Sequence, residues 1–176
     1  MRFSLSTLLV VVTLFSAWFA SVHHKATQQR STVVWLSGLH TGLWRYDSQD
    51  QSLGFPDPSN AAPSGTIEQF LGPHYAHDVE EVLVYDPQLD SLERIAKLRS
   101  LRTLDVGSEL PLDLNPVSRL TRLTQLTVHA ESIDSLRPLH KMSNLKTVLL
   151  VDTRVDRHEI DALQAARPEM QVQLVP

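Results

Sequence analysis

Apolar residues recur with a period of 22 residues through the C-terminal half of the chain. Counted from Leu101 as position 1, each repeat is apolar at positions 1, 4 and 6. The residues are Val79, Val82 and Val84, then Leu101, Leu104 and Val106, then Leu123, Leu126 and Val128, then Leu145, Val148 and Leu150. A fixed spacing of this kind indicates one structural unit stacked on itself. The alternation between positions 4 and 6 predicts a short strand in each repeat, with these side chains directed into the core.

The second half of each repeat is predicted to return through a tight helical or 3₁₀ turn. Positions 11, 14, 17 and 20 are apolar in most repeats, so the spacing changes from two to three. Pro116 and Pro138 both fall at position 16, where proline suits the first turn of a helix. The pattern resumes at Val172 and Leu174 after an irregular step, which predicts a final strand in a C-terminal cap.

The N-terminus predicts a membrane anchor over residues 1–23. Residues 3–22 carry no formal charge, and a helix of this length spans about 30 Å, the thickness of the hydrocarbon layer. The alternative is a cleaved signal peptide, which needs small residues at −3 and −1 of the cut. No two of the small residues Ser16, Ala17, Ala20 and Ser21 are two apart, which favours a retained anchor. The basic residues on the two sides do not decide which side of the membrane holds the repeat domain.

Three further parts are expected after the anchor. Residues 24–47 are predicted to form a juxtamembrane helix and a short strand, residues 48–65 a flexible loop rich in proline and glycine, and residues 66–176 the repeat domain with its two caps. The juxtamembrane helix has a partial apolar face, made of Val33, Val34, Leu36 and Leu39. Thr66 and Gln69 form a capping-box pattern, so a short helix is expected there to cover the open end of the first repeat.

The repeat motifs resemble leucine-rich repeats. The motifs are Leu101-Arg-Thr-Leu104-Asp-Val106 and the run from Ile133 to Leu145, and their 22-residue spacing is similar to that of the internalin-type class. The whole chain resembles small bacterial membrane-anchored leucine-rich repeat proteins, in which Leu-Gly and then Val-x-x-Val open the repeat domain; Phe70-Leu71-Gly72 and Val79-Glu80-Glu81-Val82 match here. The resemblance implies an α/β solenoid with parallel strands behind one transmembrane helix, in a group that mostly lacks an assigned activity.

The chain departs from this resemblance at position 9. The family usually has asparagine there, with its side chain bonded to backbone groups between turns. The residues here are Pro87, Glu109, Glu131 and Thr153. Water or other backbone groups are therefore expected to satisfy these turns, which predicts a less regular solenoid.

The sheet face formed by positions 3, 5 and 7 is the predicted binding surface, and its predicted function is non-catalytic binding of a protein whose identity the sequence leaves open. The candidate residues are Glu81, Leu83, Tyr85, Thr103, Asp105, Gln125, Thr127, His129, Thr147, Leu149 and Val151. The alternative for Leu149 and Val151 is that the C-terminal cap covers them. Four strands offer roughly 250 Å², whereas a standard interface takes about 800 Å² per partner.

Other functional classes find less support in the sequence. The net charge of −4 argues against nucleic-acid binding, and the absence of cysteine excludes disulfides and thiolate metal sites. No catalytic motif is present, and the adjacent Glu80 and Glu81 face opposite sides of a strand, so neither an enzyme nor a cofactor is expected. A structural or self-associating role in the cell envelope is the first alternative.

Two charged groups of residues leave alternatives open. His74, His77 and Asp78 lie close together in the sequence, so a metal-dependent activity is a second alternative to protein binding, although a surface loop is favoured. At position 19, Lys97, Arg119 and Lys141 form a basic column that suits an anionic lipid or an acidic partner, or simply keeps the solenoid soluble.

Overall fold

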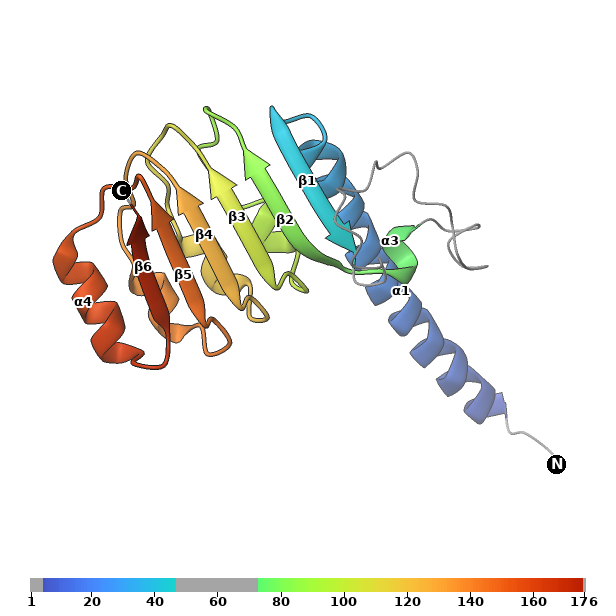
Figure 1. Ribbon diagram of the computed structural model, residues 1–176. Helices are drawn as coiled ribbons and strands as arrows, with labels where there is room; N and C mark the ends of the chain where they lie inside the picture. The colour runs from blue at the N-terminus through green and yellow to red at the C-terminus, as the bar shows by residue number, and fades with distance from the viewer. Residues whose placement is uncertain (1–4, 47–72, 176) are drawn as a thin grey trace.

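The computed structural model describes residues 5–46 and 73–175, so the predicted loop over 48–65 and capping helix at 66–71 lie outside the described residues. A long helix precedes a six-stranded sheet whose strands follow chain order (Figure 1). The helices are α1 (Leu5–Leu36), α3 (Pro73–Ala76) and α4 (Arg157–Ala166), and the 3₁₀ helices are η1 (Ile95–Lys97), η2 (Asn115–Arg119) and η3 (Arg137–Lys141). The strands are β1 (Thr41–Tyr46), β2 (Val79–Tyr85), β3 (Thr103–Gly107), β4 (Gln125–His129), β5 (Thr147–Val151) and β6 (Gln171–Val175).

The 22-residue period is confirmed as a stack of parallel strands. Strands β2 to β6 pair in parallel, and Leu104, Leu126 and Val148 stand opposite one another in successive strands. These three side chains are buried, as are those two residues further along each strand. The chain therefore folds as an α/β repeat structure with a parallel sheet, in which each turn buries the same column of side chains.

The return segments are 3₁₀ helices, as the three-residue spacing predicts. Pro116 and Pro138 occupy the first turn of η2 and η3, where the missing N–H has no intrahelical partner to lose. Val117 and Leu139 point from these turns into the core and are fully buried. The short 3₁₀ turn keeps each repeat thin enough for neighbouring strands to pair.

The N-terminal end of the solenoid is covered by the second half of α1 and by β1. Ala26, Gln29, Val33 and Leu36 form the buried stripe of the helix, at spacings of three and four residues. The prediction that Val34 belongs to the apolar face of this helix is wrong, because its side chain is 62% exposed. The buried amide of Gln29 is satisfied, since its Nε2 donates to the His77 carbonyl at 2.8 Å.

Strand β1 pairs antiparallel with β2 and closes this edge of the sheet. The chain turns back sharply between α1 and β1, and a Cβ on Gly42 would lie 2.0 Å from the Leu36 carbonyl oxygen. Only glycine allows the strand to pass this close to the helix end. Tyr46, at the end of β1, is buried against the core.

Serine and threonine hydroxyls take the place of the missing asparagines. The buried Ser108 Oγ donates to the Leu89 carbonyl at 2.7 Å, one repeat away. The hydroxyl of Thr153 accepts from the Ala130 N–H at 3.2 Å. The expectation that water or backbone alone satisfies these turns is therefore wrong for two of them, because short side chains at positions 8 and 9 reach the neighbouring repeat.

Helix α4 and strand β6 form the C-terminal end. Val172 and Leu174 pair with Val148 and Leu150, so the irregular step is confirmed as a further strand. Asp156 begins α4 as its N-cap, because its Oδ1 accepts from the His158 N–H at 2.9 Å. The helix takes the place of a fourth 3₁₀ turn and packs against η3 and β6.

Candidate binding face

The eleven predicted binding residues lie on one face of the sheet. This face, which we call the open face, is the side of the strands turned away from the 3₁₀ turns (Figure 1). Strand pairing arranges it in three rows. The rows are Glu81, Thr103, Gln125, Thr147 and Gln171; Leu83, Asp105, Thr127, Leu149 and Gln173; and Tyr85, Gly107, His129, Val151 and Val175.

The residues of the open face differ in how much of their side chains a partner can reach. Tyr85 is 46% exposed and Gln125 is exposed, whereas Thr127 is only 6% exposed between its neighbours. Leu149 and Val151 are half-buried, and β6 lies beside them in the sheet. Thr127 therefore contributes little contact area.

An aromatic cluster occupies the row at the ends of β2, β3 and β4. The rings of Tyr85 and His129 lie edge to face with centroids 6.3 Å apart, although β3 separates their strands. The Tyr85 ring reaches across Gly107, where an added Cβ would lie 2.0 Å from Tyr85 Cδ2. Glycine at this position is therefore required for the two rings to meet.

Asp105 extends the cluster into the middle row. Its Oδ1 lies 3.6 Å from Nε2 of His129, an ion pair when the imidazole is protonated. Burial raises the pKa of the Asp105 carboxyl, and the nearby His129 opposes part of that rise. The cluster thus combines a flat aromatic surface, a hydroxyl, an imidazole and a carboxylate within one small area.

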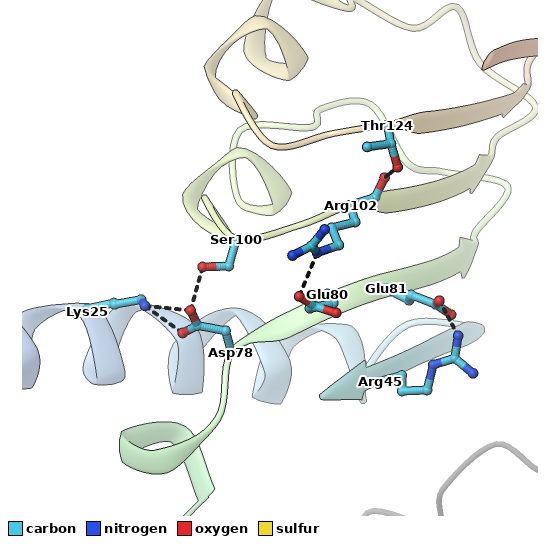
Figure 2. Close-up of polar contacts among 8 residues, drawn as sticks. All are labelled: Lys25, Arg45, Asp78, Glu80, Glu81, Ser100, Arg102 and Thr124. Carbon is cyan, nitrogen blue, oxygen red and sulfur yellow. Dashed lines mark hydrogen bonds and ion pairs between the residues drawn. The ribbon is translucent and has the colours of Figure 1, made fainter. Parts of the chain in front are cut away.

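Strands β1 and β6 widen the open face beyond the predicted residues. Leu43 and Arg45 pair with Leu83 and Glu81, and Arg45 forms an ion pair with Glu81 (Figure 2). Six strands give roughly 400 Å² of sheet surface. Position counting missed the β1 residues because an antiparallel strand lies outside the 22-residue period.

The predicted metal-ligand residues diverge in the structure. His74 Nδ1 lies 3.1 Å from the hydroxyl of Tyr46, and burial lowers the pKa of His74, with Arg30 adding to the effect. Asp78 is held by Lys25, with Nζ at 2.6 Å, and by the hydroxyl of Ser100 at 2.7 Å (Figure 2). Among the described residues, no group of three or more His, Asp and Glu side chains is placed to hold a metal ion.

Asp78 fastens α1 to the first two repeats. Burial alone would raise the pKa of this carboxyl, but the hydrogen bonds from Lys25 and Ser100 outweigh burial and hold the pKa below its ordinary value. The contact joins α1 to the residue before β2 and to the turn before β3 (Figure 2). Sequence spacing gives no signal for it, because Lys25 and Asp78 are 53 residues apart.

Within the described part of the chain, one helix, α1, is long and apolar enough to cross a membrane. The apolar side chains of its first half are not packed against the rest of the described chain, and Leu9, Leu14, Phe15 and Trp18 are all largely exposed. A signal sequence or the core helix of a soluble protein has a similar length and composition.

The described structure has a partial likeness to a solved structure. The crystal structure of an internalin C2 from Listeria monocytogenes is similar with 25% sequence identity and a TM-score of 0.39. The matched region covers 53% of this chain and 42% of the internalin chain, so the likeness spans less than half of that protein. No protein-family model matches the sequence, and no curated protein matches it either.

Proposed function

We propose that the chain is a membrane-tethered, non-catalytic protein-binding module whose contact surface is the open face. The observation that carries this proposal is the cluster of Tyr85, His129 and Asp105 over Gly107. Exposed aromatic residues that are held in place are typical of the residues that dominate protein interfaces. The remaining predicted residues of the open face supply surrounding contact area.

The tether compensates for the small size of the face. A surface of roughly 400 Å² is about half of what one partner contributes to a standard interface. Confinement to a membrane raises the effective concentration of a membrane-bound partner, so a weak contact suffices. The exposed apolar half of α1 supports such a tether, since Leu9 to Phe19 would otherwise leave large side chains in water.

Site-specific photo-crosslinking in membranes of the source cells tests the proposal. A photoreactive residue replaces Gln125 on the open face in one variant and Gln164, which is exposed on α4, in the matched control. We expect a crosslinked protein at Gln125 that is absent at Gln164 and that disappears when Tyr85→Ala is added. Equal crosslinking at both sites, or crosslinking at Gln125 that survives Tyr85→Ala, would contradict the proposal.

Self-association through β6 is the second candidate function. Strand β6 is the last strand of the described sheet, and Leu174 is 54% exposed on it. An edge strand with exposed apolar side chains is a template for pairing with another strand. This role predicts dimers of the full chain in detergent, measured by light scattering, that Leu174→Ser converts to monomers while Tyr85→Ala leaves them intact.

A further inference from the structure

The edge of the sheet at which the parallel strands begin carries an excess of basic side chains. Five exposed cations there have no ion-pair partner among the described residues, namely Lys97, Arg99, Arg122, Lys141 and Lys146. Arg99, Arg122 and Lys146 lie in the turns that lead into β3, β4 and β5, and Lys97 and Lys141 are the last residues of η1 and η3, just before two of these turns. We call these five residues the basic edge.

The acidic residues on the same edge are already neutralised. Asp78 is bound by Lys25, and Glu80 accepts from Nε of Arg102 at 2.7 Å (Figure 2). Glu169 forms an ion pair with Arg167 in the turn before β6. The five cations of the basic edge therefore act as an uncompensated positive row.

The opposite edge of the sheet, where the strands end, is acidic. The turns that leave the strands carry the exposed Asp90, Glu109, Asp113, Asp134 and Asp156, together with Glu131, which pairs with Arg154. The repeat itself creates this separation, because positions 19 to 22 and position 2 of the next repeat fall at one edge and positions 8 to 13 at the other. The net charge of −4 conceals it.

The apolar half of α1 projects from the basic edge. Helix α1 runs alongside the strands, and its N-terminal half extends past the edge where they begin (Figure 1). A hollow of about 300 Å³ lies at the junction, lined by Ser21, His24 and Lys25 of α1 and by Lys97 and Arg99 of the neighbouring turn, among others. Its α1 residues follow directly after the exposed apolar segment that ends at Phe19.

We propose that the basic edge binds the anionic phospholipid headgroups of the membrane that α1 enters, with one headgroup phosphate in the hollow between Lys97, Arg99 and His24. This inference rests on the membrane anchor of the proposed function. A bilayer fits better than an acidic protein because the apolar half of α1 extends from the same edge of the sheet that carries the row of cations (Figure 1). A membrane that this helix enters would therefore lie next to the cations. Each Lys or Arg near an anionic surface raises binding about fivefold, within about 10 Å of that surface.

Such docking fixes how the solenoid stands on the membrane. The strands rise from the surface, the acidic edge lies farthest from the lipid, and the open face is turned sideways. A partner then meets Tyr85 and His129 by moving along the membrane, which suits a partner held in the same bilayer.

The absence of cysteine allows a direct test on the full chain. A fluorophore is attached at Ser143→Cys on the basic edge or at Gln88→Cys on the acidic edge, both exposed positions. The protein is reconstituted into vesicles of phosphatidylcholine with or without phosphatidylglycerol, and quenching by a headgroup-linked quencher is measured. We expect quenching at Ser143→Cys only with phosphatidylglycerol, and none at Gln88→Cys.

Charge-matched variants identify the residues responsible. Lys97→Gln, Arg99→Gln and Lys146→Gln together should lower the docking constant about 100-fold, from three contributions of about fivefold each. Arg137→Gln, Arg154→Gln and Arg157→Gln remove the same charge away from the basic edge and should leave docking unchanged. Equal effects of the two triple variants would overturn the proposal.

Other outcomes separate this inference from the anchor. A chain that floats with vesicles while the Ser143→Cys label stays unquenched in phosphatidylglycerol overturns headgroup binding and leaves the anchor standing. A chain that floats with neither kind of vesicle overturns both. A label that responds to soluble polyglutamate as strongly as to phosphatidylglycerol would assign the basic edge to an acidic protein and refute the lipid proposal.

Discussion

The two ends of the solenoid meet the same physical problem in different ways. A stack of repeats exposes an apolar layer at each terminus. At the N-terminal end, α1 and β1 cover that layer and bury Val33, Leu36 and Tyr46. At the C-terminal end, α4 buries only Leu163 among its ten residues, and Leu174 on β6 stays largely exposed. The N-terminal cap is thus part of the hydrophobic core. The C-terminal end is formed by strand β6, which has no further strand beside it in the described chain.

This contrast assigns different roles to the ends. The covered end couples α1 to the solenoid through apolar packing and through polar contacts such as Lys25 with Asp78. Trp35 adds to the coupling, because Arg94 of the first return lies over its ring at 5.3 Å. A helix attached this firmly passes its orientation to the whole domain.

Removing a core side chain at the covered end should have the largest effect. Leu36→Ala is expected to lower the free energy of unfolding by about 2–5 kcal/mol, the range also expected for Leu126→Ala at the centre of the stack. Both side chains are fully buried. Chemical denaturation of the full chain in detergent micelles measures the change.

Val34→Ala is the matched control, because Val34 lies on the exposed side of the same helix. Its cost should stay within about 0.5 kcal/mol. If Leu36→Ala proves as mild as Val34→Ala while Leu126→Ala is severe, α1 does not unfold together with the repeats.

A glycine substitution probes the close passage of β1 over α1. Gly42→Ala should cost about 1–3 kcal/mol, because its Cβ would collide with backbone atoms of Leu36 that have no room to move aside. Gly38→Ala is the control, since its Cβ meets only the Trp35 carbonyl oxygen at 3.4 Å. Similar melting temperatures for the two variants would mean that β1 does not hold this position against the helix.

The sequence predicted the repeated part of the fold because the repeats carry their own register. Positions 1, 4 and 6 must be apolar in every turn, so Leu104, Leu126 and Val148 align without further information. The sequence did not predict the hydroxyl contacts of Ser108 and Thr153, because serine and threonine are equally common on turns where their hydroxyls contact only water. Only the stacked backbone shows which hydroxyl reaches the next repeat.

Less of the covered end and of the open face could be predicted. Val33 and Val34 are chemically alike, and only the docking of α1 decides which one is buried. The rows of the open face followed from strand alternation, but the Tyr85 and His129 contact did not. That contact depends on Gly107, whose small size matters only because β3 lies between the two rings.

Acid should loosen the C-terminal end through Glu159. Its Oε2 accepts from the Leu136 N–H at 3.0 Å and from the hydroxyl of Ser135 at 2.9 Å, which join α4 to the return before η3. These two hydrogen bonds lower the pKa of Glu159 below its ordinary value of 4.5. The stability they provide is present above that ordinary value and is lost as the pH falls through the lowered pKa.

Thermal unfolding measured across this acid range should show the effect. Glu159→Gln is expected to weaken α4 docking at neutral pH, by less than Leu36→Ala or Gly42→Ala lowers stability. It should also reduce the dependence of the melting temperature on pH in the acid range. Asp161→Asn, an exposed carboxylate of the same helix, is the matched control. If Glu159→Gln leaves the acid dependence of the melting temperature unchanged, these hydrogen bonds are not the source of the acid sensitivity of α4 docking.

The smallest expected effect is also the sharpest test of the comparison between the two ends. Leu150 and Leu174 pair with each other in the same inward row, yet Leu150 is fully buried and Leu174 is 54% exposed. Leu150→Ala should cost about 2–5 kcal/mol, whereas Leu174→Ala should change the free energy of unfolding by less than about 0.5 kcal/mol. Denaturation of both variants at a protein concentration where the chain is monomeric measures the difference. If Leu174→Ala costs as much as Leu150→Ala under those conditions, Leu174 is covered in the monomer, and the two ends of the solenoid are closed alike.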